Sequence, residues 1–510
     1  MTCLKSISLP LLFAISAILL VPGNAKSQIS HTAESMALGG GGTAYLTGFE
    51  SLFVNPANLF IREKNYDFQF SFLQAGYHFN SLVPIRGNQH RFKRYLDLNA
   101  PYNAGLNQKI SGASVREDLI SRSFNENANS SEFQTQSEMV WFGLQWVRPH
   151  RSYALSARTR MASNYELSRG LFSAKPMERN DSFIFDQSFS QTYQVLHEIS
   201  FGYAESFTYL NGLLPQLSEF IVGIAPKIVI PGGYLDVQYQ NRYQMDTDGG
   251  FWDRETEYRQ RSAGVLSDRA ENFFFPQTNP DVSAANMRDL MRPGGIGFGI
   301  DAGITYLITF GDDLSVLRHE DDPTEKSLRL SISMTDLGVV YQNSNPFDFT
   351  IDRQESQTEQ TDPVSDILFQ GAPNEHYSFL SQFLDVTSFQ SFTVSEQAIE
   401  VLLPASVQAG ALFQYNRLKL MGDISYTIVE SAFKPAGIMG FAGLEIRPFS
   451  FFPLRAGTRL APDLPGYYSF GAGIDTNRFE IQGAFQLKSR RGGPTSEIIG
   501  ASAVGLKLYF

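Results

Sequence analysis

The sequence predicts an all-β fold, a transmembrane antiparallel β-barrel of about 14 strands with an N-terminal plug (hatch) inside the lumen. Three observations lead to this prediction. The chain ends in a strand of alternating character, several internal segments repeat the alternation with charges on one side only, and an apolar leader begins the chain. Together they indicate an exported chain that crosses a membrane with strands.

The closing strand, 502–510, has one apolar face and one mixed face, because successive residues of a strand point to opposite sides. The apolar face holds Val504, Leu506, Leu508 and Phe510, and the mixed face holds Gly505, Lys507 and Tyr509. An apolar face suits lipid and a mixed face suits a wet lumen. A terminal aromatic residue with its free carboxylate is common at the end of bacterial outer-membrane barrels.

The leader has the layout of a secretory signal peptide. Lys5 precedes the apolar run 7–21, and small or polar residues follow around Gly23 and Ala25. The run is too short for a spanning helix, which needs about 20 residues. We therefore expect a signal peptide at 1–25, cleaved after Ala25 or Ser27, a plug segment at 26–63, and a barrel with long extracellular loops at 64–510. The expected location is the bacterial outer membrane, with lipid as a partner.

Composition agrees with this class and excludes others. The chain has 510 residues, a net charge of -11, 42 Gly, 42 Phe and 22 Tyr. No later stretch approaches the roughly 18 apolar residues of a spanning helix, so a helical membrane protein is excluded. The negative net charge and the absence of a basic stripe argue against nucleic acid as a partner. Cys3 lies in the leader, so a mature chain without it has no disulfide.

The clearest internal strand is 297–310. Its apolar residues, Phe298 among them, share one face, whereas Asp301 lies on the other face with glycines and threonines. Segments 418–428 and 478–488 place Asp423 and Glu480 in the same way. A charge that faces lipid at mid-depth costs roughly 2–4 kcal/mol. We expect all three carboxylates to face the lumen.

The remaining candidate strands are 66–73, 139–148, 153–162, 193–203, 219–230, 235–245, 328–337, 405–415, 436–447, 454–460 and 467–475, which makes 15 with the four above. Bacterial barrels have even strand numbers. Joining 219–230 to 235–245 as one long strand, bent at Pro231, Gly232 and Gly233, gives 14. It also places the long connections 74–138, 163–192, 246–295 and 338–404 on the outer side, where long loops belong.

The segment 33–60 alternates poorly, carries four glycines at 39–42 and ends in Asn55-Pro56-Ala57. Glycine permits close packing against a wall, and Asn-Pro favours a turn, so this segment could plug the lumen. Its phrase GGGGTAYLTGFESLFVNPANL resembles the N-terminal hatch of FadL-type outer-membrane transport proteins, and 295–303 and 331–338 resemble strands of the same superfamily. Asn58 stands where such hatches commonly have Gly.

The resemblance implies a 14-stranded plugged barrel that admits a hydrophobic small molecule, captured at the outer loops and released through a bend or gap in the wall. It extends to a poorly characterised branch found in Bacteroidota and related to PorV-like proteins. The alternative implied by that branch is a type IX secretion role, or binding of a partner protein without solute transport. The long outer loops suit either function.

Six residues are candidates for the plug or for ligand binding. Phe53, Asn55 and Pro56 belong to the plug segment, and Arg447, Arg455 and Arg459 take lumen-facing positions on neighbouring strands. The arginines lie near Glu445 and across from Glu480. They could hold a ligand carboxylate or form an ion network that braces plug and wall. The ion network is favoured because barrel interiors are ordinarily polar.

No motif indicates an enzyme, a metal or a cofactor. The acidic stretch 246–257 has Phe251 where an EF-hand requires glycine. The seven histidines show no metal-ligand spacing, and no Gly-x-Ser-x-Gly or Walker element occurs. We therefore expect no enzymatic activity, no cofactor and no metal site.

Overall fold

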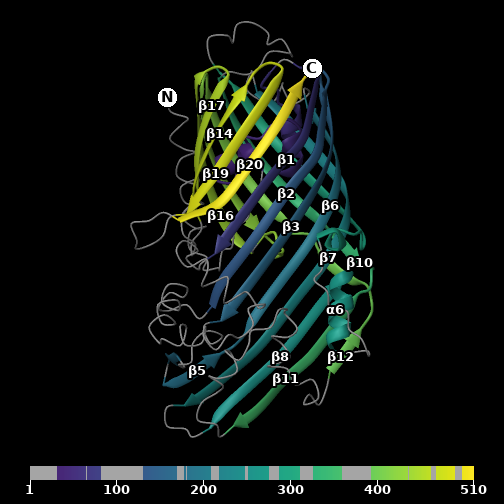
Figure 1. Ribbon diagram of the computed structural model, residues 1–510. Coiled ribbons are helices and arrows are strands. Elements are labelled where there is room, and N and C mark those ends of the chain that lie inside the picture. The colour runs from purple at the N-terminus through teal and green to yellow at the C-terminus, as the bar shows by residue number, and fades with distance from the viewer. Residues whose placement is uncertain are drawn as a thin grey trace, which may run out of the picture.

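The computed structural model describes residues 32–64, 66–81, 130–168, 177–179, 181–207, 218–246, 251–274, 287–310, 326–358, 392–434, 436–460, 467–488 and 497–510. The expected signal peptide lies outside these residues. In the described part of the chain, 14 strands form a closed antiparallel ring in which the last strand pairs with the first (Figure 1). The predicted barrel and its strand number are therefore confirmed. The ring runs through β1 (Phe68–Ser81), β2 (Ser130–Val147), β3 (Arg151–Ser168), β6 (Phe189–Ser206), β7 (Ser218–Asp246), β9 (Gly295–Thr309), β10 (Lys326–Gln342), β14 (Ser406–Tyr415), β15 (Leu418–Thr427), β16 (Gly437–Phe449), β17 (Phe452–Leu460), β18 (Tyr467–Asp475), β19 (Phe479–Lys488) and β20 (Glu497–Tyr509).

β7 is the long bent strand that the parity argument requires. Its first half pairs with β9 up to Val229, and its second half pairs with β8 (Trp252–Ala263) from Tyr234 onward. Where β7 changes partner, its register with β6 shifts between Pro231 and Tyr234, at Gly232 and Gly233. This β-bulge bends the strand without ending it.

The connections expected to be outer loops contain further strands. These are β4 (Met177–Arg179), β5 (Ser182–Asp186), β8, β11 (Phe347–Thr358), β12 (Phe392–Ser395) and β13 (Ile399–Leu402), with helices α6 (Val265–Phe274) and α7 (Met287–Leu290). The second half of β7 extends beyond the ring. Its edge there pairs with β8, β8 pairs with β11, and β11 pairs with β12. Figure 1 shows this outer sheet beyond the ring, at the end opposite the C-terminus. Sequence periodicity missed it because β8 (WDRETEYRQRSA) is polar on both faces.

The two faces of the ring have the predicted character. Phe298 is 57% exposed and Val504 59%, whereas Asp301, Asp423 and Glu480 are 1%, 4% and 4% exposed. The carboxylates face the lumen and the apolar side chains face outward, as a lipid-embedded barrel requires. In the described residues, no helix is long and apolar enough to span a membrane.

Residues 32–64, named here the luminal segment, lie inside the ring near the end that carries the C-terminus (Figure 1, purple). They form α2 (Ala33–Ala37) and two 3-10 helices, η1 (Gly48–Phe53) and η2 (Pro56–Phe60). Their apolar side chains, including Leu46, Phe49 and Leu52, share one buried cluster with wall residues such as Val140 and Leu412. The short turns between strands lie at this same end, which identifies it as periplasmic.

Candidate functional site

The wall carries glycines where the luminal segment approaches most closely. A Cβ at Gly223 would lie 2.2 Å from the Ala57 nitrogen, and one at Gly457 would lie 2.3 Å from the Leu38 carbonyl carbon. Real Cβ atoms do not approach other atoms this closely, so any side chain at these positions would displace the segment. The small residues of β7 and β17 therefore form a seat for the luminal segment.

The Asn-Pro-Ala-Asn element fixes the middle of the segment. Asn55 caps η2 by accepting a hydrogen bond from the Ala57 N–H at 3.2 Å, and Pro56 occupies the first turn. Asn58 donates to the carbonyl oxygens of Thr43 and Leu46 at 2.9 and 3.0 Å. Asn58 is not among the described residues with positive φ, so its role is hydrogen bonding and not the left-handed backbone that Gly would supply.

The glycine run is held by a wall carboxylate. Asp423 on β15 accepts hydrogen bonds from the N–H groups of Gly42 and Thr43, at 2.5 and 2.8 Å. Gly42 has φ +147°, a conformation that L side chains rarely adopt. The run therefore needs glycine here for its backbone conformation.

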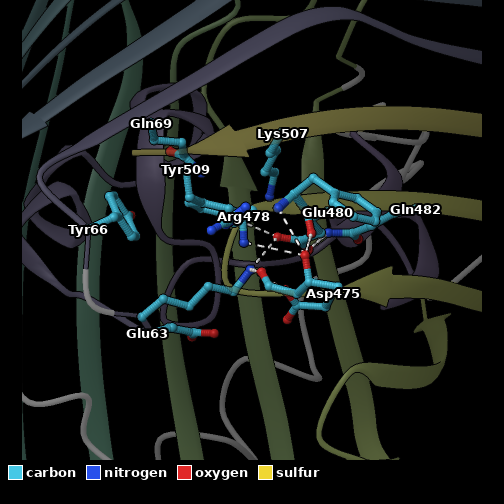
Figure 2. Close-up of polar contacts among 12 residues, drawn as sticks. Glu63, Tyr66, Gln69, Asp475, Arg478, Glu480, Gln482, Lys507 and Tyr509 are labelled. Carbon is cyan, nitrogen blue, oxygen red and sulfur yellow. Dashed lines mark hydrogen bonds and ion pairs between the residues drawn. The ribbon is translucent and has the colours of Figure 1, made fainter.

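Charged side chains join both ends of the segment to the last strands (Figure 2). Lys507 of β20 lies 3.0 Å from a Glu34 oxygen and 3.1 Å from a Glu50 oxygen. At the other end, Lys64 pairs with Asp475 and with Glu480. Figure 2 shows Asp475, Glu480 and Lys507 converging from neighbouring strands. The closing strand thus helps to hold the segment as well as to close the ring.

Burial and charge shift the pKa values of two carboxyl groups of the segment in opposite directions. Burial raises the pKa of Glu34 to about 8, although Lys507 opposes the shift. Burial also acts to raise the pKa of Glu63, but Lys419 and Arg329 outweigh it and lower that pKa to about 2. Glu34 and Glu63 therefore respond to different pH ranges.

A cavity of about 1000 Å³ lies on the other side of the barrel interior, towards the outer sheet. We name it the outer cavity. Its aromatic lining residues are Tyr165, Phe189, Tyr193, Tyr234 and Tyr239. The floor comes from residues 429–432 of the connection between β15 and β16. The volume is within the range of small-molecule pockets in proteins.

Residues 428–434, named here the inner loop, fold into the lumen instead of remaining outside. Gln136 donates to the carbonyl oxygen of Phe433 at 2.9 Å, and the Lys434 ammonium lies 2.7 Å from Asp336. The position of Asp336 is set by a bulge in β10, where its φ is 59°. The inner loop is therefore fastened at both its backbone and its side chains.

A buried ion cluster fills the space between the inner loop and the luminal segment. Arg160 pairs with Asp336 at 3.1 Å, and Lys227 pairs with Asp301 and Asp336 at 2.9 and 2.5 Å. Arg158 pairs with Glu198 at 2.7 Å, and its guanidinium lies 4.1 Å from the centre of the Phe53 ring. Arg160 lies similarly over Phe433 of the inner loop, at 5.1 Å. The interior thus holds two successive obstructions, the inner loop and the luminal segment, with a cluster of ion pairs between them.

Residues 77–478 match the model of a family described as "Family of unknown function (DUF5723)". The chain belongs to this family. No curated protein matches the chain.

Several solved barrels are similar to this chain at low sequence identity. The Pseudomonas putida toluene transporter TodX is 10% identical with a TM-score of 0.40, over 95% of this chain and 99% of that one. A Pseudomonas aeruginosa FadL homologue is 10% identical with a TM-score of 0.39, over 96% and 97%. A TodX deltaS2S3 mutant monoaromatic hydrocarbon channel gives 10% and 0.41, over 94% and 97%. Similarity at this level does not identify a ligand for this chain. That the chain forms a barrel is shown by its own strand pairing.

Three of the six residues expected at the site belong to the luminal segment, and two of the arginines meet at Glu445. Phe53, Asn55 and Pro56 are buried within this segment. Arg447 and Arg455 both contact Glu445, at 2.8 and 2.7 Å, and Arg455 also lies 3.6 Å from Glu34. This is the geometry of the bracing ion network. The Arg459 guanidinium lies 3.8 Å from the centre of the Tyr467 ring.

Sequence reasoning missed the ion cluster and the inner loop. Alternation places Arg158, Arg160 and Glu198 on lumen-facing positions, so their direction was predictable from the sequence. Their mutual pairing was not, because it depends on the register between strands. For the inner loop, the short connection after β15 (IVESAFKPA, 428–436) is mostly apolar, but its composition alone does not show that it turns inward.

Proposed function

We propose that this chain is a passive outer-membrane channel that takes up small hydrophobic molecules. The observation that supports this most directly is the arrangement of a closed ring with an outer cavity at one end and the luminal segment at the other. A molecule enters the outer cavity, where aromatic rings offer apolar faces. The luminal segment prevents free diffusion of water-soluble compounds to the periplasm.

The bend of β7 is the proposed route out of the cavity. Around Pro231, Gly232 and Gly233, β7 has left β9 and has not yet paired with β8. The Gly294 N–H donates to the Pro231 carbonyl oxygen at 2.7 Å, and Leu290 of α7 lies against Gly232 and Gly233. A seam held by few backbone hydrogen bonds opens at lower free-energy cost than a continuous ladder.

The test is uptake of butylbenzene, a neutral apolar solute, by liposomes that contain the purified full chain. We expect uptake above that of protein-free liposomes, and faster, less selective uptake after deletion of 34–58. Heat-modifiable mobility in electrophoresis checks that the deletion variant keeps its barrel. Uptake equal to protein-free liposomes for the full chain and for the variant, with every apolar solute tried, would refute the proposal.

A second candidate is binding of a partner protein without solute transport, and the outer sheet favours it. β8, β11 and β12 extend well beyond the ring, and among the described residues one edge of β12 has no strand partner, so another strand could pair there. The type IX secretion role stays a prediction from resemblance. Purification from native membranes separates the two candidates, since a stoichiometric partner retained through every step favours docking.

A further inference from the structure

We propose that residues 287–294, named here the outer strap, close the exit at the bend of β7 from the lipid side, and that His197 is the positioning residue that holds the strap in place. The outer strap consists of α7 and the four residues that follow it. This inference rests on the proposed function and deepens it, because it identifies what controls the exit. It depends on where the strap lies, how it is hydrogen-bonded and how it is anchored.

The outer strap lies against the outward face of the wall. On β6 the outward row includes Ile199, which is 45% exposed, and it continues through His197 to Val195, which is 0% exposed. An added Cβ at Gly232 would lie 2.8 Å from the Leu290 oxygen and 3.0 Å from the Val195 Cβ. The strap and Val195 therefore meet at the bend, and the strap covers a part of the row that would otherwise face lipid.

The outer cavity lies on the other side of the same bend. Gln194 and Tyr234 are paired between β6 and β7 beside the bend, and both line the cavity. On the outward side, an added Cβ at Gly233 would lie 3.4 Å from Leu290 Cδ2. A molecule that leaves the cavity at this bend therefore meets the strap before it reaches lipid.

A chain of hydrogen bonds joins the strap to the outward face. His197 Nε2 lies 3.1 Å from the Met291 carbonyl oxygen, and His197 Nδ1 lies 2.9 Å from the Thr159 hydroxyl. A carbonyl oxygen only accepts, so we assign the proton to Nε2, and Nδ1 accepts from Thr159. Trp141 Nε1 in turn donates to the Thr159 hydroxyl oxygen at 2.9 Å. The ring of His197 is thus held with its donor directed at the strap.

Polar side chains on a lipid-facing surface need such partners, because lipid offers no water to an unpaired donor or acceptor. Thr159 and His197 are paired in register on β3 and β6, and the Met291 carbonyl of the strap accepts from the second of them. The strap therefore accounts for a histidine in an otherwise apolar outward row. Its displacement would take this acceptor from His197, which favours the closed position.

The strap is anchored to the wall at its C-terminal end. The Gly294 N–H donates to the Pro231 carbonyl oxygen at 2.7 Å, and the Gly294 carbonyl oxygen accepts from two N–H groups just after β10, at 2.8 Å each. The α7 end instead contacts the wall through Leu290 and the Met291 carbonyl. The strap can therefore swing about Gly294 while β9, which begins at the next residue, stays in the ring.

The experiment compares His197→Leu with His197→Gln in the full chain. Leucine removes the hydrogen bond to Met291, whereas glutamine keeps an N–H donor. For His197→Leu we expect about fivefold faster amide exchange over 288–294 and about fivefold faster butylbenzene uptake by liposomes, the factor that one ordinary hydrogen bond supplies. His197→Gln should resemble the unchanged chain in both measurements. Tyr203→Phe is the matched control, because it removes a hydrogen bond to Glu205 from the outward face of the same strand.

A reversible lock supplies a second measurement. The double variant Gly233→Cys with Leu290→Cys places two thiols on either side of the contact between bend and strap, and the one cysteine of the sequence, Cys3, lies in the expected leader. Mass spectrometry identifies the chains in which the disulfide has formed. In these chains butylbenzene uptake should fall to the level of protein-free liposomes, and a reductant should restore it.

Uptake by the unchanged chain that neither His197→Leu nor the closed disulfide alters would overturn the strap and leave the proposed uptake standing. Faster exchange in His197→Leu without faster uptake would also overturn it, because the segment would then be held by His197 without closing the exit. If neither the unchanged chain nor His197→Leu takes up any apolar solute, the proposed function fails and this inference fails with it.

Discussion

The Asn55 carboxamide donates a hydrogen bond to the Thr305 hydroxyl, with 2.9 Å between Nδ2 and Oγ1. Thr305 in turn lies 2.6 Å from the Asn58 carboxamide oxygen. The two ends of this contact are 250 residues apart in the chain, on the luminal segment and on β9. The hydrogen bonds of the Asn-Pro-Ala-Asn element therefore serve docking to the wall as well as the local turn.

We predict that Asn55→Ala destabilises docking of the luminal segment by about 1–3 kcal/mol, because buried partners on Thr43 and Thr305 lose their hydrogen bond. Hydrogen exchange of the amides at 32–64 measures the effect as faster exchange. The control is Gln357→Ala, which removes an exposed side chain on β11. Equal protection of the segment in both variants contradicts the prediction.

A matched pair of glycine substitutions tests the seat of the segment. Gly223→Ala should displace η2 and cost about 1–3 kcal/mol of docking free energy, since its Cβ would lie 2.2 Å from the Ala57 nitrogen. Gly422→Ala, with no atom within 4 Å of the added Cβ, should leave docking unchanged. Limited proteolysis of the segment reports the difference. Similar cleavage rates in the two variants would show that the close approach does not determine docking.

Lys434 fastens the inner loop, so Lys434→Met should loosen it. The ammonium lies 2.7 Å from Asp336 and 3.0 Å from the Ser406 hydroxyl, and loss of a charged hydrogen bond costs roughly 2 kcal/mol. We expect faster uptake and faster amide exchange over 428–434. Lys326→Met at the start of β10 is the control and should resemble the unchanged chain. Slower or unaltered uptake in Lys434→Met would mean that the inner loop is not an obstruction.

Docking of the luminal segment should depend on pH in two separate ranges. Burial raises the pKa of Glu34 from 4.5 to about 8. The contribution of protonated Glu34 to the docking free energy is therefore complete below about pH 4.5 and is lost as pH rises through 8. The pKa of Glu63 shifts in the opposite direction, to about 2. Burial acts to raise this pKa, but the positive charges of Lys419 and Arg329 lower it by more. Its contribution is present above about pH 4.5 and is lost as pH falls towards 2.

Proteolytic protection of the segment, measured from pH 3 to pH 9, should therefore be greatest near pH 4.5. Glu34→Gln should abolish the decline on the alkaline side and leave the acid side unchanged. A protection profile that rises steadily from pH 5 to pH 9 in the unmodified chain would contradict the assigned direction for Glu34.

The sequence alone predicted the strands, their two faces and the single long strand through Pro231, Gly232 and Gly233. These properties are local, because alternation has a period of two residues and every charge on the lipid side carries a free-energy cost. It also indicated that Asn55 and Pro56 belong to a turn that lies in the lumen. What it left open was the role of Arg447 and Arg455, for which a ligand carboxylate and a bracing network were both possible.

Only the tertiary structure shows which side chains pair with these arginines, because closure of the ring brings Glu34, Glu445 and Asp475 to them. It also decided that the inner loop turns inward and forms the floor of the outer cavity. Both depend on which strands become neighbours and in what register, and residues hundreds of positions apart meet only once the ring has closed. Alternation along a single strand carries no information about such meetings.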